Sequence, residues 1–100
     1  MVNLKIGKND EGNTEYYLTE LETYESFEQV ITEIINQDVT LIDQLDGIYS
    51  RTALLDIDGK TFKIIFHEDV GIYAFSTSKL DDEEWLHKVL ISVVKKLNKP

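Results

Sequence analysis

The order of apolar and polar positions divides this chain into two helical segments and a series of short strands. Over residues 24–37, apolar side chains recur at three- and four-residue spacing, which is the period of one buried helix face. That stripe consists of Phe27, Val30, Ile31, Ile34 and Ile35. A second stripe at the same spacing, within residues 81–98, consists of Leu86, Val89, Leu90, Val93, Val94 and Leu97. The pattern therefore predicts helices over about 24–37 and 81–98.

Both predicted helices begin with residues that can cap a helix. Ser26 and Gln29 have the spacing of a capping box, and Thr23 is an equal candidate for the N-cap. The second helix starts with four consecutive acids, of which Asp81 and Glu84 form a further capping box. Negative charge at a helix start complements the helix dipole. We therefore interpret this acidic run as helix-start chemistry.

From residue 39 the apolar period changes to two, as in strands whose side chains alternate between two faces. Four short strands are predicted over residues 39–45, 48–57, 61–67 and 71–76. Residues 2–6 and 15–21 are weaker strand candidates, so residues 1–14 form either an edge strand or a mobile segment. The pattern predicts one α+β domain over residues 1–100. Its antiparallel sheet has four to six strands, with a meander from about residue 39 to 76 and both helices packed on one face.

The predicted turns set the expected pairing of the strands. Asp46-Gly47 and Asp58-Gly59 predict two-residue hairpins, because Asp and Gly accept the positive φ that a type I′ turn requires. Glu68-Asp69 predicts a third turn of the same length. With these turns, Phe62 lies opposite Phe75. The sheet face that becomes the core then collects Ala53, Leu55, Phe62, Ile64, Phe66, Tyr73 and Phe75.

The opposite face of the predicted sheet is more apolar than a solvated sheet should be. It collects Leu54, Ile65 and Ile72, and a tight first hairpin adds Val39 and Leu41. A sheet face in contact with water normally carries polar residues at these positions. We therefore expect one of two arrangements. Either residues 1–21 cover this face, or it is an interface with a second copy or with another protein.

The formal net charge of −9 belongs wholly to the first half of the chain. Residues 1–50 carry eleven acidic side chains and two lysines, whereas residues 51–100 carry eight of each sign. A one-sided field attracts positively charged partners and repels nucleic acid. We expect an exposed partner-binding surface on the first helix and the residues that lead into it, made of Glu20, Glu22, Glu25, Glu28 and Glu33.

The residue inventory gives little support to catalysis or ligand chemistry. The chain has no cysteine, which excludes disulfides and thiolate chemistry and favours a cytoplasmic location. No phosphate-binding glycine loop, signal peptide or membrane-spanning run is present. His67 beside Glu68-Asp69 has metal-ligand types, but we interpret it as a surface strand end. Arg51, the single arginine, is expected in a buried ion pair or in a stack on an aromatic ring. We expect no metal, no cofactor and no enzymatic activity.

The segment Leu54–Thr61 resembles the first motif of the haloacid dehalogenase phosphatases, in which an apolar strand runs into D-x-D-G-T. The resemblance implies that Asp56 is a nucleophile and Asp58 a general acid/base, with a Mg²⁺ ion between carboxylate and phosphate. Lys60 interrupts the motif before its threonine, and the same Asp-Gly pair is the preferred dipeptide of a tight hairpin. We therefore interpret the segment as a turn and predict no catalysis there.

The sequence favours a small acidic, non-enzymatic protein-interaction module of bacterial or phage type. Immunity proteins, antitoxins and phage-encoded inhibitors use acidic surfaces to occupy basic sites on other proteins, and the present composition suits that class. The alternative is a self-associating domain that uses the apolar sheet face around Leu54, Ile65 and Ile72. A small-molecule binder is the third hypothesis. Neither nucleic acid nor a membrane is an expected partner.

Overall fold

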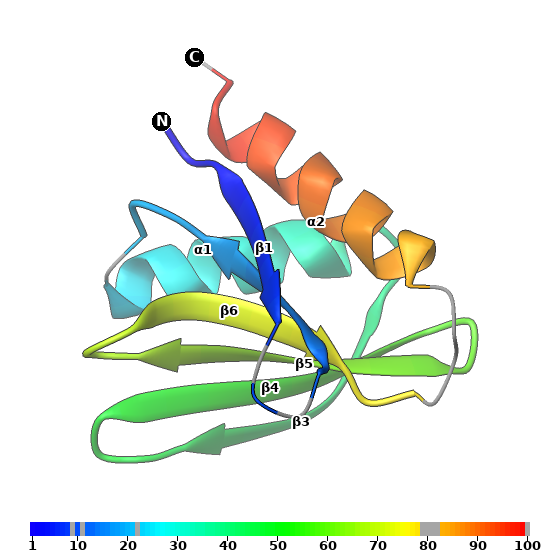
Figure 1. The fold of residues 1–100 in the computed structure, drawn as a ribbon, viewed down its shortest axis with the longest axis horizontal. Coiled ribbons are helices and arrows are strands. Elements are labelled where there is room, and N and C mark those ends of the chain that lie inside the picture. The colour runs from blue at the N-terminus through cyan, green and yellow to red at the C-terminus, as the bar shows by residue number, and fades with distance from the viewer. Residues whose placement is uncertain (9, 11, 22, 79–82, 100) are drawn as a thin grey trace.

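The computed structural model describes residues 1–8, 10, 12–21, 23–78 and 83–99, within which two helices cover one face of a six-stranded antiparallel sheet (Figure 1). This confirms the predicted α+β class. The strand order across the sheet is β1-β2-β6-β5-β4-β3. The strands are β1 (Leu4–Lys8), β2 (Thr14–Leu18), β3 (Thr40–Asp46), β4 (Ser50–Ile57), β5 (Lys60–His67) and β6 (Gly71–Ser76), and the helices are α1 (Tyr24–Ile35) and α2 (Glu84–Leu97).

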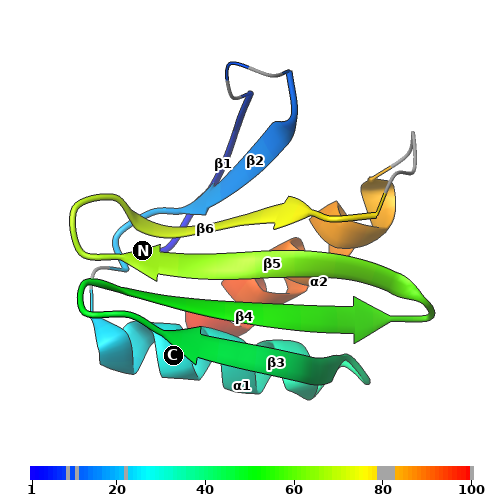
Figure 2. The same cartoon turned by 90° about the horizontal axis from the view of Figure 1, so that it is seen from below.

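The N-terminal hairpin extends the sheet rather than covering it. β2 pairs with β6, and β1 pairs with β2 as the outermost strand. Figure 2 shows β3 to β6 side by side with both helices behind them, while β1 and β2 continue the sheet beyond β6. The expectation that residues 1–21 cover the second sheet face is therefore wrong. We call that face of β3–β6, which points away from the helices, the outer face.

Helix α1 starts at the N-cap that local chemistry predicts. The Thr23 hydroxyl oxygen accepts a hydrogen bond from the backbone N–H of Ser26 at 3.0 Å, so Thr23 rather than Ser26 is the cap. The predicted stripe faces the sheet, since Phe27, Val30 and Ile34 are fully buried. Helix and sheet thus meet through the apolar positions that the 3.6-residue period selects.

Helix α2 starts with a less favourable cap. Its N-cap is Glu83, whose side chain makes no capping hydrogen bond. The Glu83 Oε1 atom is buried and has no hydrogen-bond partner within the described residues, and burial raises the pKa of this carboxyl. Asp81, the predicted capping residue, lies outside the described residues. The buried positions of α2 are those predicted, namely Leu86, Val89, Leu90 and Val93.

The hairpin between β4 and β5 forms as predicted and fixes the centre of the core. Ile57 pairs with Lys60, and both turn residues have positive φ, 52° at Asp58 and 82° at Gly59. The side chains that this register directs toward the helices are almost fully excluded from solvent. They are Ala53 and Leu55 on β4 and Phe62, Ile64 and Phe66 on β5.

The predicted register of β6 is wrong by one residue. His67 pairs with Gly71, so the β5–β6 turn contains three residues, Glu68 to Val70, and not two. A shift of one residue exchanges the two faces of a strand. Ile72 and Ala74 therefore point into the core, with 1% and 0% exposure, and Ile72 does not belong to the outer face. Tyr73 and Phe75, which were predicted in the core, lie on the outer face instead.

The predicted register of β3 is also wrong, for two reasons. The connection to β4 turns at Ile48 and Tyr49 rather than at Asp46-Gly47, since Asp46 pairs with Arg51 and the Gly47 N–H donates to the Ser50 carbonyl at 2.7 Å. A β-bulge between Leu41 and Asp43 then inserts one extra residue. As a result, Leu41 pairs with Leu55 on the core face, and Val39, only 3% exposed, is buried with it.

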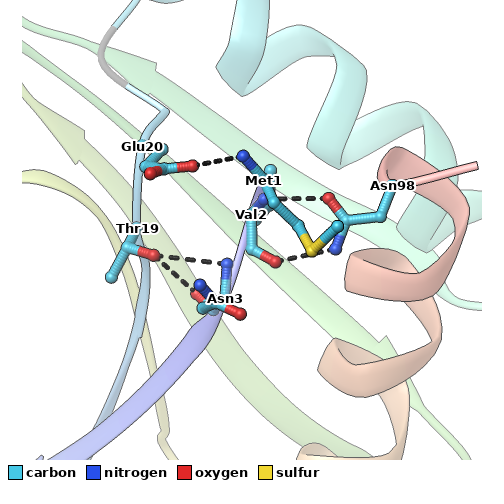
Figure 3. A network of polar contacts seen from close by, with 6 residues as sticks. All are labelled: Met1, Val2, Asn3, Thr19, Glu20 and Asn98. Atoms are coloured by element: carbon cyan, nitrogen blue, oxygen red, sulfur yellow. Dashed lines mark hydrogen bonds and ion pairs between the residues drawn. The ribbon is translucent and has the colours of Figure 1, made fainter.

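The chain start is anchored to the end of α2 (Figure 3). The backbone N–H of Val2 donates to Asn98 Oδ1 at 2.8 Å, and Asn98 Nδ2 donates to the Val2 carbonyl at 2.7 Å. The Thr19 N–H donates to the carbonyl of Asn3 at 2.9 Å, and the Met1 amine pairs with Glu20. These contacts join the outermost strand to both its neighbour and a helix, so the edge of the sheet is held in place.

The cap of α1 gives a direct stability test. We expect Thr23→Ala to lower the free energy of unfolding by about 1 kcal/mol, because the Ser26 N–H loses its acceptor. That loss corresponds to a melting temperature lower by roughly 4–8 °C for a domain of this size. Thermal unfolding followed by circular dichroism measures it. Thr23→Ser keeps the acceptor oxygen and should stay near the wild type, and equal losses in both variants would contradict the assignment.

The partly buried carboxyl of Glu83 predicts a pH-dependent effect on stability. Because burial raises its folded pKa, the ionised form is disfavoured in the folded state and lowers stability at neutral pH. We expect Glu83→Gln to raise the melting temperature at pH 7. The gain should shrink as the pH falls through the folded pKa toward the ordinary glutamate range, where the native carboxyl becomes protonated. A variant that is less stable than the wild type at pH 7 would show that the charge is instead favourable.

Candidate functional site

Two connections and the start of α1 meet at one end of the sheet, on the left of Figure 2. The Glu68 N–H in the β5–β6 turn donates to the Tyr49 carbonyl in the β3–β4 connection at 3.0 Å. The hydroxyl of Tyr24, in the first turn of α1, donates to the carbonyl of Ile48 at 3.4 Å. We call this region the acidic end. Its carboxylates are Glu25, Glu28, Asp46, Glu68 and Asp69.

The centre of the acidic end is an exposed apolar tip formed by Ile48, Tyr49 and Val70. These side chains are 84%, 63% and 57% exposed. Their backbone is held by the hydrogen bonds that join the two connections to each other and to α1, and by the Gly47 to Ser50 hydrogen bond at 2.7 Å. Large apolar side chains are thus presented to solvent on backbone that the fold already holds in position.

Arg51 ties α1 to the sheet at this end. Its guanidinium lies over the Tyr24 ring, 4.5 Å from the centroid, and donates to Glu28 Oε1 at 2.7 Å. Asp46 lies 3.7 Å from Arg51 Nε on the other side. The predicted aromatic stack is therefore present, but the ion pair lies at the surface rather than buried, since the Arg51 and Glu28 side chains are 30% and 55% exposed. A single arginine balances two carboxylates here, while Glu25, Glu68 and Asp69 form no ion pair with any other described residue.

The structure separates the five acids that the sequence groups together. Glu25 and Glu28 belong to the acidic end. Glu33 lies farther along α1, where Lys96 Nζ is 3.8 Å from its carboxylate. Glu25, Glu28 and Glu33 line one open groove of about 500 Å³ together with Gln29, Thr32, Lys96 and Leu97. Glu20 pairs with the Met1 amine outside this groove, and Glu22 lies outside the described residues.

An open recess of about 430 Å³ adjoins the apolar tip at Val70. Its lining combines apolar side chains with two charges, and consists of Lys5, Tyr17, Leu18, Thr19, Glu20, Leu21, Val70, Gly71 and Ile72. Glu20 and Val70 therefore line the same recess. The tip and the recess together give this end a protrusion beside a hollow.

Sequence reasoning missed the residues that the β3–β4 and β5–β6 connections contribute. The sequence pattern predicts turns at Asp46 and at Glu68-Asp69, which also has metal-ligand types beside His67, and it predicts a strand at Tyr49. A signal was available, because alternate turns of an antiparallel meander lie at the same end of the sheet. The first and third turns of the meander therefore had to lie at one end, and each carries acids.

The aspartates of the phosphatase-like segment act in a turn. Asp56 Oδ1 accepts the Gly59 N–H at 3.2 Å, and Asp58 is an exposed turn residue. The His67 Nδ1 atom accepts the Asp69 N–H at 3.1 Å, and His87 stacks on Tyr16 with ring centroids 6.2 Å apart. Within the part of the chain that the structure describes, no group of three or more histidine, aspartate or glutamate side chains is arranged to hold a metal ion.

Comparisons of the chain with protein-family models, curated proteins and solved structures found no match. Among the described residues, no helix combines the length and apolar composition that crossing a bilayer requires. Functional inference therefore depends on the surfaces of this structure.

The turn geometry predicts that Asp56 is not a nucleophile. We expect no Mg²⁺-dependent hydrolysis of p-nitrophenyl phosphate by the purified protein, because the Asp56 carboxylate accepts the turn N–H at Gly59. Asp56→Asn should leave this background unchanged. Hydrolysis that requires Mg²⁺ and disappears in Asp56→Asn would establish the phosphatase chemistry that the motif resembles.

Proposed function

We propose that this protein is a small, acidic, non-enzymatic interaction module whose acidic end binds a basic partner protein. The observation that carries the proposal is the exposed apolar tip of Ile48, Tyr49 and Val70 at the same end of the sheet as five acidic residues. Protein interfaces combine an apolar centre with a polar rim in this manner. The complementary surface on the partner is an apolar pocket bordered by lysine and arginine side chains.

The two parts of the acidic end have different physical roles in this proposal. Tyr49 and Ile48 supply apolar area that leaves water on binding, and tyrosine is among the residues that most often dominate binding energy. The carboxylates of Glu25, Glu68 and Asp69 accelerate encounter with a positive surface and disfavour other partners. Because hydrogen bonds already hold the backbone of the tip, little conformational entropy of this backbone is lost on association.

The charge of this end also argues against two other partners. Nucleic acid carries phosphates that the carboxylates repel, and its binding needs clustered lysine and arginine. A second copy docked by the same end would bring like charges together. A basic protein surface, such as the substrate site of a nuclease or a toxin, meets both the charge and the apolar requirement. The proposed class is therefore that of inhibitors and immunity-type proteins.

A photo-crosslinking amino acid at position 49 tests this proposal in a lysate of the source organism. We expect a basic protein to be captured at low salt and progressively lost as added salt screens the carboxylates. The captured protein is then purified and its affinity measured by calorimetry. Tyr49→Ala should weaken binding about tenfold or more, and Glu68→Lys should weaken it in a salt-dependent manner.

Asp10→Lys is the matched control, because it makes the same charge change in the exposed β1–β2 connection, at the other end of the sheet. Its affinity should stay close to that of the wild type. An acidic partner, or a basic partner whose affinity is insensitive to both Tyr49→Ala and Glu68→Lys, would contradict the proposed site.

A further inference from the structure

β1 and β3 are the outermost strands of the sheet, and their free edges differ (Figure 2). The edge of β3 is interrupted by the bulge between Leu41 and Asp43. The Asp43 carboxylate also accepts the N–H of Gln44 at 2.9 Å, so a side chain already satisfies this backbone donor. Bulges and charges on an edge strand prevent a further strand from pairing with it. β3 is therefore a blocked edge.

The edge of β1 is regular, and its outward backbone groups are unpaired. The pairs of β1 with β2 follow one another without a bulge. The Thr19 N–H donates to the Asn3 carbonyl at 2.9 Å, so every second residue from Asn3 onward directs its backbone toward β2. The intervening residues, Leu4, Ile6 and Lys8, direct their N–H and C=O groups away from β2. No other described strand pairs with them.

β1 carries positive charge within the acidic half of the chain. Lys5 and Lys8 are the only basic side chains among residues 1–50, and both lie on this strand. Neither forms an ion pair with a carboxylate of the described residues. Ile6 lies between them and is 54% exposed. A segment that fits this edge must therefore supply backbone hydrogen-bonding groups, negative charge and an apolar side chain.

We propose that the free edge of β1 binds an extended acidic segment of a partner protein as an additional antiparallel strand. Main-chain hydrogen bonds give such strand addition its affinity, and alternate side chains give it specificity. A second copy of this chain is a poor occupant, because its β3 is blocked and pairing two β1 strands gathers lysines with no acidic residue among them. No residue of β1 belongs to the acidic end, so the inference is independent of the proposed function.

The register of this pairing predicts the pattern of the acidic segment. When one of its residues lies opposite Ile6, antiparallel pairing sets the next residue opposite Lys5 and the residue two positions earlier opposite Lys8. Directly opposed side chains lie about 4.5–5.5 Å apart at Cβ, which permits ion pairs. From its N-terminal end, the segment therefore reads acid, any residue, apolar, acid.

The peptide T-E-T-V-E-V-T, blocked at both ends, tests the proposal by NMR titration of the whole chain. We expect the largest shifts at the amides of Leu4, Ile6 and Lys8, whose N–H groups gain acceptors. The basic counterpart T-K-T-V-K-V-T should bind about tenfold more weakly or worse, because like charges then face each other.

Two methylated peptides separate strand pairing from charge attraction alone. Methylation of the first valine nitrogen removes a donor that points at Ile6, and should weaken binding about tenfold. Methylation of the second glutamate nitrogen is the matched control, because this N–H points away from β1. The control peptide should bind like the parent peptide.

Three variants of the protein test the register, and circular dichroism first confirms that each is folded. Lys5→Glu should weaken the parent peptide about tenfold and favour T-E-T-V-K-V-T, whose lysine lies opposite position 5. Lys63→Glu makes the same charge change on β5, three strands away, and should leave both affinities unchanged. Ile6→Pro removes an N–H that faces away from β2, which an edge strand tolerates, and should weaken the parent peptide about tenfold.

Binding of neither the acidic nor the basic peptide up to about 1 mM would overturn the proposal, and would leave Lys5 and Lys8 as residues that keep the edge unpaired. Equal binding of the two peptides would also overturn it. So would an acidic peptide whose affinity is insensitive to methylation of the nitrogen that faces Ile6, because strand pairing would then be absent from the contact.

Discussion

Burial of a single sheet face beneath two amphipathic helices is the constraint on which this structure depends. Phe62, Ile64 and Phe66 on the central strand β5 are almost completely excluded from solvent, together with Phe27 of α1 and Leu90 of α2. Each such side chain contributes roughly 1.5–3 kcal/mol relative to exposure. Domains of this size are stable by only about 5–15 kcal/mol in total. The choice of which residues face the helices therefore decides whether the chain folds.

Two small irregularities satisfy that constraint at the sides of the central hairpin. The three-residue turn before β6 directs Ile72 and Ala74 toward the helices, and the bulge in β3 directs Leu41 and Val39 the same way. Without them, a strict alternation would place these side chains in water. Each irregularity also determines what the opposite face displays. Tyr73 and Phe75 are on the outer face because Ile72 and Ala74 are in the core.

The same topology gives the molecule two separate surfaces with different chemistry. At one end, the meander places two acidic connections beside the start of α1, and Arg51 joins helix to sheet by contacting Tyr24 and Glu28 together. Across the outer face, aromatic and aliphatic side chains surround Lys63. The acidic end is the surface that we propose for a positively charged partner.

The sequence by itself determined the elements and the centre of the fold. Helical periodicity located the buried stripes of α1 and α2, Thr23 was an available cap, and the Asp58-Gly59 turn set the pairing of β4 with β5. These features are local, because each follows from residues a few positions apart. The phosphatase-like motif was interpreted as a turn for the same reason.

Only the tertiary structure decided the faces of β3 and β6 and the place of the N-terminal hairpin. A two-residue turn and a three-residue turn differ little in local energy, and so do strands with and without a bulge. One extra residue in either place nevertheless exchanges the core-facing and solvent-facing side chains of the strand. Packing against the helices selects one register, because both helices need apolar contacts across the whole sheet face that they cover. The acidic end likewise depends on the tertiary structure. Asp46, Glu68 and Asp69 lie near Glu25 and Glu28 because the folded meander brings its connections to the start of α1. Residues this far apart in sequence become neighbours through packing and not through local pattern.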